Sequence, residues 1–492
     1  MFRALSVLVI LWYMWFRYTR RKLNELAAKI PAFPGLFLVM GAFQFAYNAS
    51  DFIFEIMTKI CSFSFQHGGI LRLWTGPRLY VGITNPEDTE YILKNCLEKE
   101  DLVTFLRSIV GNASAFAPVS QWIYRRKILA PTFSPKTIYS YMDMVSEESL
   151  ELVKKLSLDN RIGTGPFSMW KYISTYTLSS LTATALGLKL SFQEADLPVI
   201  KAVLDIFKLL THRMVHLWLW PNWLYRRTAQ YVEYQKSLGI LYGLTDEILK
   251  NKRDHPPDDL SKAGGNQTQC FLDYLLKGAS YDGSGLTDVE IRDEITLFLL
   301  AGTDTSAISI CNILKLLGKY PDVQEKIHAE FLSVLGDSDR PLHKNDLKEL
   351  KYLNRVVKES LRMFPPVPII VRKTMKEITL PSGTTLPNNT GIIIFVWGVN
   401  RDPTYWGPNA NSFNPDRFLA TNSNLLASFS LGPRNCVGYQ FAFIVIKVAL
   451  ATILRRYKVV GEREDSDVPK INSTFSIMLR DRDGYEISLE KR

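Results

Sequence analysis

The sequence FSLGPRNCVG occupies residues 429–438 and leads into an apolar segment, 441–454, that predicts a buried helix. Cys436 therefore lies at the predicted start of that helix. Gly432 and Gly438 flank it and let the backbone approach a flat ligand closely, while N–H groups at the helix N-terminus can stabilise a thiolate. These features predict that Cys436 is a sulfur ligand to haem iron; the alternative is a buried free cysteine in a turn.

The other four cysteines show no paired spacing, and the odd total of five argues against a disulfide framework. We therefore expect reduced thiols in a cytosolic environment. The histidines give a metal site little support, because only His212 and His216 stand four residues apart and no third ligand is close by. If a metal is bound, a cysteine is the expected ligand.

The 492 residues include 59 Lys and Arg against 49 Asp and Glu, which gives a net charge of +10. This excess favours an acidic protein partner or an anionic membrane surface. No nucleic-acid partner is predicted, because no dense basic run is interleaved with aromatic residues. No glycine-rich nucleotide-binding unit occurs, so electrons for a redox reaction must come from another protein.

A second feature is the sequence EITLFLLAGTDTS at residues 294–306, an apolar helical pattern with a glycine, an acid and alcohols in its middle. Gly302 costs a helix about 1 kcal/mol relative to alanine, and Thr and Asp compete for backbone hydrogen bonds. Such a segment is unfavourable unless it has a function. Asp304 and Thr305 are therefore predicted to deliver protons; the alternative is a solvent-facing polar stripe.

A third feature is the pair Glu359 and Arg362, whose spacing of three places both side chains on one face of a predicted helix. Alone, such a pair is ordinarily a surface ion pair. The downstream sequence FNPDRF at 413–418 supplies Arg417 as a second cation, and a glutamate shared by two arginines can be satisfied when buried.

In this order along the chain, these motifs resemble those of the cytochrome P450 superfamily of haem-thiolate monooxygenases. The family's cysteine loop matches Phe429, Gly432, Cys436 and Gly438, and its oxygen-activating helix motif matches Ala301 to Ser306. The resemblance implies haem b, with an axial thiolate from Cys436, as the cofactor. It further implies that the haem propionates are held by four residues: Trp122, Arg126, Arg372 and Arg434.

The resemblance implies insertion of one oxygen atom from O2 into an apolar substrate such as a fatty acid, a hormone-like lipid or a xenobiotic. Electrons would come from NADPH through NADPH-cytochrome P450 reductase, with cytochrome b5 as a further candidate donor. Reductase docking on the cysteine side is predicted to use five basic residues: Arg125, Lys127, Lys447, Arg455 and Arg456. A haem-thiolate isomerase or dehydratase without a reductase, and a non-catalytic haem-binding protein, are the alternatives.

Within the superfamily, the sequences around Lys351–Leu353 and Leu286–Asp288 resemble the branch of fatty-acid ω-hydroxylases and insect-type enzymes. Many members of that branch carry, in place of Ala301, a glutamate esterified to the haem. No covalent haem ester is therefore expected in this chain.

The expected fold is mainly α with small β-sheets, as one large unit behind a membrane anchor. Strand-like runs are Leu71–Gly82, Ile369–Thr374, Gly391–Val396 and the segment near Tyr485–Leu489. The domains are expected to be an anchor with a basic stop segment (1–22), a Pro-rich hinge (23–35) and a haem-binding catalytic domain (36–492).

The anchor prediction rests on the apolar residues 4–16, followed by a basic cluster that ends at Lys22. A helix of this length covers about 20 Å of a hydrocarbon core of roughly 30 Å, so its flanks must help it to span. The basic flank predicts an endoplasmic reticulum membrane location with the catalytic domain in the cytosol. Two further apolar stretches, 36–47 and 214–225, can be read equally as membrane contacts or as core.

Overall fold

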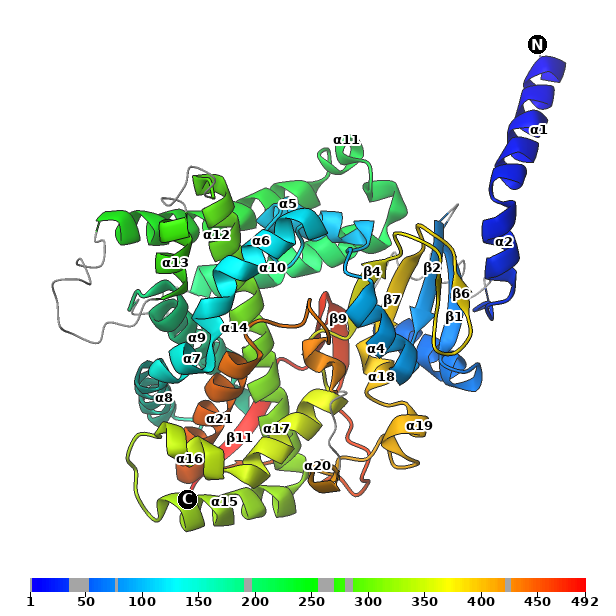
Figure 1. The fold of residues 1–492 in the computed structure, drawn as a ribbon. Coiled ribbons are helices and arrows are strands. Elements are labelled where there is room, and N and C mark those ends of the chain that lie inside the picture. The colour runs from blue at the N-terminus through cyan, green and yellow to red at the C-terminus, as the bar shows by residue number, and fades with distance from the viewer. Residues whose placement is uncertain are drawn as a thin grey trace.

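The computed structural model describes residues 2–34, 53–75, 78–189, 197–254, 270–278, 286–420 and 426–492. Helices dominate these residues, which confirms the predicted mainly helical fold (Figure 1). The α-helices are α1 (Phe2–Thr19), α2 (Arg21–Ala28), α4 (Pro86–Asn95), α5 (Thr104–Val110), α6 (Val119–Leu129), α7 (Pro135–Ser140), α8 (Met142–Ser157), α9 (Trp170–Leu181), α10 (Leu197–Val215), α11 (Asn222–Tyr225), α12 (Ala229–Asp254), α13 (Phe271–Gly278), α14 (Asp288–Lys319), α15 (Pro321–Leu335), α16 (Lys344–Glu349), α17 (Lys351–Met363), α18 (Val396–Val399), α19 (Pro403–Trp406), α20 (Arg417–Ala420) and α21 (Tyr439–Arg456).

The strands form small sheets at the edges of the helical body. They are β1 (Ile70–Thr75), β2 (Arg78–Ile83), β3 (Phe167–Ser168), β4 (Ile369–Lys373), β5 (Ile378–Thr379), β6 (Thr385–Leu386), β7 (Gly391–Phe395), β8 (Tyr457–Val460), β9 (Ser473–Ser476), β10 (Met478–Asp481) and β11 (Glu486–Lys491). The largest sheet has the order β1-β2-β7-β4, with β2 and β7 parallel and the other pairs antiparallel. The run predicted at 71–82 is thus two paired strands, and the other three predicted strands lie where expected.

Helix α14 passes through the centre of the helical body (Figure 1). Thr287 caps its first turn with Glu290 in a reciprocal capping box, and α9, α12 and α21 pack along it. Among the described residues it is the helix long and apolar enough to cross a membrane, but 83% of its apolar window is buried in protein. It is therefore the core helix, and it carries the 294–306 motif into the interior.

The N-terminal helix α1 projects away from the body, whereas the Pro-rich segment after it is docked (Figure 1). Arg72 N–H donates to Pro31 O at 2.7 Å, and Phe33 N–H donates to Arg72 O at 3.3 Å, so this segment extends the edge of β1. The hinge is described as far as Pro34, and the apolar stretch 36–47 lies outside the described residues. Docking to β1 fixes the point from which α1 leaves the body.

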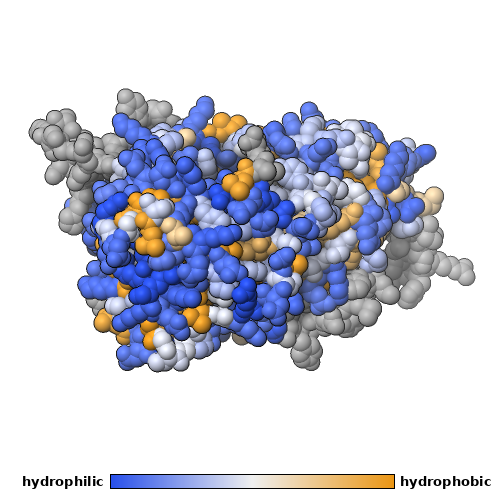
Figure 2. All heavy atoms as spheres, turned by 90° about the horizontal axis from the view of Figure 1, so that it is seen from below, coloured by the Kyte–Doolittle hydropathy of each residue, from blue (hydrophilic) through white to orange (hydrophobic). Residues whose placement is uncertain are grey.

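The stretch 214–225 divides between core and surface. Leu219 and Tyr225 are buried, whereas Leu217, Trp218 and Trp223 are more than half exposed. Leu217 and Trp218 belong to the 3₁₀ turn Leu217–Leu219, and Trp223 belongs to α11. Helix α11 is drawn at the top of Figure 1, the side toward which α1 also points. The face seen from below in Figure 2 is mostly hydrophilic, with apolar residues in small scattered groups.

Candidate active site

The loop that carries Cys436 is held in a tight turn before α21. Cys436 N–H donates to Phe429 O at 2.8 Å, and Asn435 N–H donates to Gly432 O at 3.1 Å. Gly432 has φ +71°, and a Cβ on it would meet Leu93 O at 2.5 Å, so the turn requires glycine. The loop is thus closed against α4 by a contact that no larger residue could make.

The turn presents the Cys436 side chain outward. Cys436 is exposed, whereas the other four cysteines are buried. The protein that surrounds its thiol on the remaining sides raises its pKa, and a hydrogen bond from Gly438 N–H and the charge of Arg126 lower it. Of the five cysteines, only Cys436 is therefore accessible to a ligand, and it is offered by a loop with N–H groups around it.

Two arginines near this loop are buried without enough partners. Arg372 is fully buried; its Nη1 donates to Val371 O at 2.9 Å, but its Nε and Nη2 have no hydrogen-bond partner. Arg434 donates from Nη2 to Ala117 O at 2.6 Å, and its Nε and Nη1 are likewise unpaired. Each lies in the field of another cation, and burial lowers the pKa of both guanidinium groups to about 10. Buried charges in this state require an anion.

Trp122 and Arg126, both on α6, lie against the cysteine loop. The guanidinium of Arg434 stacks over the Trp122 ring, 4.7 Å from its centroid. Arg126 donates to Asn435 O at 3.2 Å and to Asn435 Oδ1 at 2.9 Å. The four predicted propionate residues thus converge on one region, but Arg126 already binds the loop that holds Cys436.

On α14, Asp304 and Thr305 point to different partners. Thr305 Oγ1 donates to Ala301 O at 2.7 Å, one turn back, and Ala301 is exposed although it lies within the core helix. Asp304 is buried and forms an ion pair with Arg480 of β10, whose guanidinium lies 4.8 Å from the Trp170 ring centroid. The acid and the alcohol are neighbours in sequence but not hydrogen-bonded to each other.

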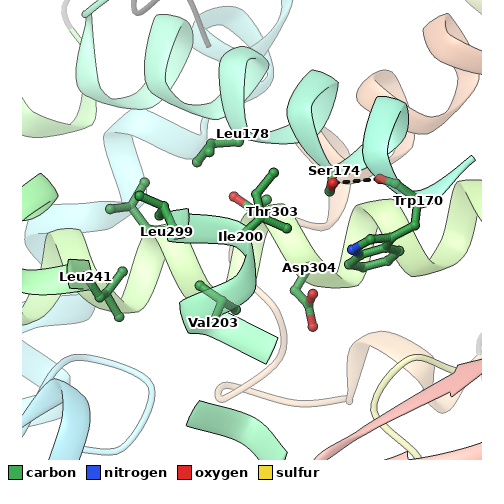
Figure 3. Close-up of a pocket in the computed structure, with 10 residues that line it drawn as sticks. Trp170, Ser174, Leu178, Ile200, Val203, Leu241, Leu299, Thr303 and Asp304 are labelled. Carbon is green, nitrogen blue, oxygen red and sulfur yellow. Dashed lines mark hydrogen bonds between the residues drawn. The ribbon is translucent and has the colours of Figure 1, made fainter. Parts of the chain in front are cut away.

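A small cavity adjoins Asp304 behind α14, between α9, α10 and α12 (Figure 3). Leu178, Ile200 and Val203 line most of it, with Thr303 and Asp304 as its polar members on α14. Sequence reasoning missed Arg480, because it lies in no motif and 176 residues separate it from Asp304. Only the fold brings this arginine to the acid.

Glu359 is shared by two arginines in the interior. Arg362 Nε and Nη2 donate to its two oxygens at 2.7 and 2.8 Å, and Arg417 Nε lies 3.6 Å from Oε1. Glu359 and Arg362 are both fully buried. Arg362 also donates to Asn400 O and Ala410 O, so the cluster joins α17 to the segment before α20, near the cysteine loop.

The comparisons with known proteins agree with this geometry. Residues 31–488 match the family model described as Cytochrome P450. The chain belongs to the cytochrome P450 family. Cytochrome P450 4V2 of Homo sapiens is 32% identical over 87% of this chain and 83% of its own length. Cytochrome P450 4c21 of Blattella germanica is 31% identical over 94% and 95%, and cytochrome P450 4g15 of Drosophila melanogaster is 28% identical over 98% and 96%. These relatives match the predicted ω-hydroxylase and insect-type branch.

Members of the P450 family use haem b with a cysteine thiolate ligand and are monooxygenases, so this P450 is a haem-dependent oxidoreductase. The residues present fit that cofactor. The unpaired N–H groups of Arg372 and Arg434 suit carboxylates, the Gly432 turn lets backbone come close, and Cys436 and Ala301 are both exposed. The described residues contain no cluster of three or more His, Cys, Asp or Glu side chains that could hold a metal ion.

The predicted docking charges of this P450 need correction. Arg125 is buried and pairs with Glu290 at 2.6 Å and Glu294 at 3.2 Å, and Lys447 is buried with its ammonium on Leu347 O. Neither side chain can present its charge to a partner protein, because each is buried and already bound to groups inside the fold. Of the remaining three, Arg455 and Arg456 bond to nearby carbonyls, and Lys127 is exposed.

Proposed function

We propose that this P450 inserts one oxygen atom from O2 into an apolar organic substrate, with Cys436 as the axial thiolate. The observations that support it most are the exposed Cys436 loop, the under-partnered Arg372 and Arg434 near that loop, and the exposed Ala301 one turn before Thr305 on the core helix α14. When bound, the haem-thiolate group supplies activation of O2. Residues 36–492 act as one catalytic unit in this proposal, because Trp122 contacts Arg434 beside the Cys436 loop although the two residues lie far apart in that range.

In this proposal the side chains of the protein orient the haem and transfer protons. Arg372, Arg434, Trp122 and Arg126 hold the carboxylate edge, and Arg126 also keeps the Cys436 loop in register through Asn435. Thr305 Oγ1, on the face that also exposes Ala301, is placed to hold and pass a proton. Asp304 must exchange its Arg480 partner before it can pass a proton to that face.

The proposed apolar substrate is based on the residues expected to line the pocket. The stretches Phe105–Val119, Pro366–Val371 and Thr474–Ile477, which are mostly apolar in sequence, are the proposed walls of the substrate pocket. Fatty acids, hormone-like lipids and xenobiotics are the classes proposed. Because residue 301 is alanine, no carboxyl is available there for a haem ester, and the haem should be released unmodified by denaturing acid.

We assign the electron donor as a membrane-bound NADPH-cytochrome P450 reductase, with cytochrome b5 as a second donor, and the location as the endoplasmic reticulum membrane. Support comes from α1, whose side chains from Leu11 to Trp15 are all more than half exposed. At 1.5 Å per residue its 18 residues reach about 27 Å, close to the thickness of a hydrocarbon core. Lys127 on α6 remains available for an acidic donor.

The test uses the purified protein with reductase, NADPH and a panel of fatty acids, terpenoids and xenobiotics. A monooxygenase should consume NADPH and substrate together, and its reduced carbonyl complex should show the red-shifted Soret band of a thiolate ligand. Cys436→Ala should abolish that band, and Cys96→Ala, a buried cysteine, should leave it unchanged. Substrate turnover without NADPH would instead indicate an isomerase or dehydratase, and a haem protein that is never reduced would indicate a carrier.

A further inference from the structure

The loop that joins α5 to α6, residues 111–118, has several of its backbone groups bound by charged side chains. Arg107 Nε and Nη2 donate to Phe116 O at 2.9 and 2.7 Å. Arg434 Nη2 donates to the next carbonyl, Ala117 O, at 2.6 Å. The conformation of this loop therefore depends on side chains that lie outside it.

On its other side the loop is bound to the core helix α14 through Glu294. Ser114 N–H donates to Glu294 Oε1 at 2.7 Å. Arg125 Nη1 lies 3.2 Å from the same oxygen and also donates to Asn112 O at 2.6 Å. Glu294, Arg125 and Ser114 are all buried. One carboxylate and one guanidinium thus hold a donor and an acceptor of the loop, and charge-assisted hydrogen bonds of this kind are stronger than neutral ones.

The loop also packs directly against α14 at Gly111. This glycine has φ +50°, and a Cβ on it would lie 2.0 Å from Asp293 Oδ2, so the close approach requires glycine. Further along the loop, Ala113 and Ala117 are fully buried. The loop is therefore packed on the core helix as well as bonded to it.

Glu294 lies on the same face of α14 as the proposed reaction site. Seven residues separate it from Ala301, which is two helical turns, or about 10 Å along the axis. Ala301 is exposed on that face, and Thr305 follows it one turn later. The loop 111–118 belongs to the stretch Phe105–Val119, one of the proposed walls of the substrate pocket. A change at Glu294 should therefore act on a pocket wall and leave the Cys436 loop in place.

We propose that Glu294 is a positioning residue for substrate binding: through Ser114 and Arg125 it holds the loop 111–118 in place as a preformed wall of the substrate pocket. This inference rests on the proposed function and adds a selectivity to it. A wall that is ordered before the substrate arrives costs no conformational entropy on binding. Long apolar ligands, which must lie along the wall, gain from this order, whereas a small ligand that reaches only the haem does not.

The experiment compares two probes on the holoenzyme, imidazole and N-dodecylimidazole, by the shift of the haem Soret band during titration. Imidazole occupies the iron alone, whereas the dodecyl chain must also lie along the pocket walls. Glu294→Gln keeps the size of the side chain and removes its charge. It should weaken binding of N-dodecylimidazole about tenfold, because the bonds to the loop lose their charge and the loop must be ordered by the ligand, and leave imidazole affinity unchanged.

A second variant changes the other partner of the bond. Ser114 follows Ala113 in the turn that Phe116 N–H closes on Ala113 O, and proline is favoured at this second position of a turn. Ser114→Pro therefore removes the N–H donor at a place that accepts proline. It should weaken the long probe to a similar extent. The double variant should bind no more weakly than the weaker single variant, because both changes break the same bond.

Glu290→Gln is the matched control. Glu290 also pairs with Arg125, at 2.6 Å, but its remaining bonds go to Thr287 at the start of α14 rather than to the loop. Both probes should bind this variant as they bind wild type. An equal loss in Glu290→Gln would assign the effect to the charge of Arg125 and overturn the role of Glu294.

Equal affinity of wild type, Glu294→Gln and Ser114→Pro for N-dodecylimidazole would also overturn the inference and leave the haem site standing. The same would follow if imidazole binding weakened as much as binding of the long probe, because the effect would then lie at the haem and not at the wall. A wild-type protein that carries no haem would instead refute the proposed function.

Discussion

Thr305 is the residue at which proton handling is easiest to isolate, because its hydroxyl makes a single hydrogen bond to Ala301 O within its own helix. Its neighbour Asp304 is committed to Arg480 and is buried. Removing the hydroxyl therefore removes one function, whereas removing the carboxylate also leaves a buried arginine unpaired.

Thr305→Ala should lower product formation by about tenfold or more, because a placed proton donor contributes about 10²–10⁴-fold. NADPH consumption should continue, with its electrons diverted to hydrogen peroxide. The measurement is peroxide and product formed per NADPH. Ser309→Ala is the matched control, since Ser309 makes the same bond to Thr305 O one turn further along but is buried, and its coupling should stay at the wild-type value. Equal coupling in both variants would remove Thr305 from proton delivery.

Lys447 offers a test of buried charge away from the site. Burial lowers its pKa to about 8; Glu330 raises the pKa and Lys358 lowers it. Between about pH 8 and the ordinary lysine pKa near 10.4, the unfolded chain binds more protons than the folded one, so this residue makes stability rise with pH in that window.

Lys447→Met should therefore be more stable than wild type at pH 7, and the difference should shrink as the pH approaches 10. Urea unfolding of both proteins at several pH values measures this difference. Lys127→Met, at an exposed lysine, should show no such trend. A constant difference at all pH values would mean that packing rather than charge controls the effect.

At the scale of elements, buried ion pairs connect segments that are distant in the sequence. Asp304 and Lys315, both on α14, bind Arg480 and Asp481 of β10, the second pair at 2.6 Å. Glu359 joins α17 to Arg417 at the start of α20. These ion pairs fix the core helix α14 and the elements around the cysteine loop relative to β10 and α20. Breaking one of them should therefore lower the stability of the folded protein and not only remove a local contact.

Glu359→Gln should lower the free energy of unfolding by about 3–5 kcal/mol, because it leaves the buried Arg362 without its counter-charge. Denaturant unfolding gives the value. Glu349→Gln provides the comparison, since Glu349 pairs with Lys351 at 3.3 Å with both side chains largely exposed, and its loss should cost less than about 1 kcal/mol. Similar costs for the two changes would contradict the structural role of the cluster.

At the scale of the whole molecule, α1 and the stretch 214–225 both carry exposed large apolar side chains. Helices α1 and α11 lie on the upper side in Figure 1, whereas the face in Figure 2 is mostly hydrophilic. Arg227 stacks over Trp223 with 5.4 Å between its guanidinium carbon and the ring centroid, an arrangement that suits the headgroup level of a bilayer. We propose that α1 and this exposed aromatic group both contact the membrane, and the next experiment tests this.

Deletion of residues 2–19 should leave a folded enzyme, because α2 and the Pro31–Phe33 bonds to Arg72 are retained. Flotation with anionic vesicles should show weaker but measurable binding. Adding Trp218→Ser and Trp223→Ser to the deletion should remove what remains, since both side chains are more than half exposed and their loss leaves no cavity. A truncated protein that floats like the full chain would refute α1 as the main anchor.

Local patterns in the sequence were enough for the helical class, the strands and the residues of the Cys436 loop. Periodicity indicates which face of an element is apolar, and a glycine such as Gly432, four residues before Cys436, indicates a turn that requires glycine. The family resemblance was needed to predict that Trp122, Arg126, Arg372 and Arg434 lie together at one site. Two of the five predicted docking charges, Arg125 and Lys447, were wrong, because a basic residue has the same sequence pattern whether it faces water or a buried partner.

Tertiary structure alone decided what each side chain meets. It pairs Asp304 with Arg480, 176 residues later, and it pairs Arg125 with Glu290 and Glu294 in the interior. The Pro-rich segment, predicted as a stiff hinge that separates the anchor from the body, adds to the edge of β1. The physical reason is common to all three: sequence pattern encodes local conformation and amphipathicity, whereas the pairing of charges depends on which distant elements the packed core brings together.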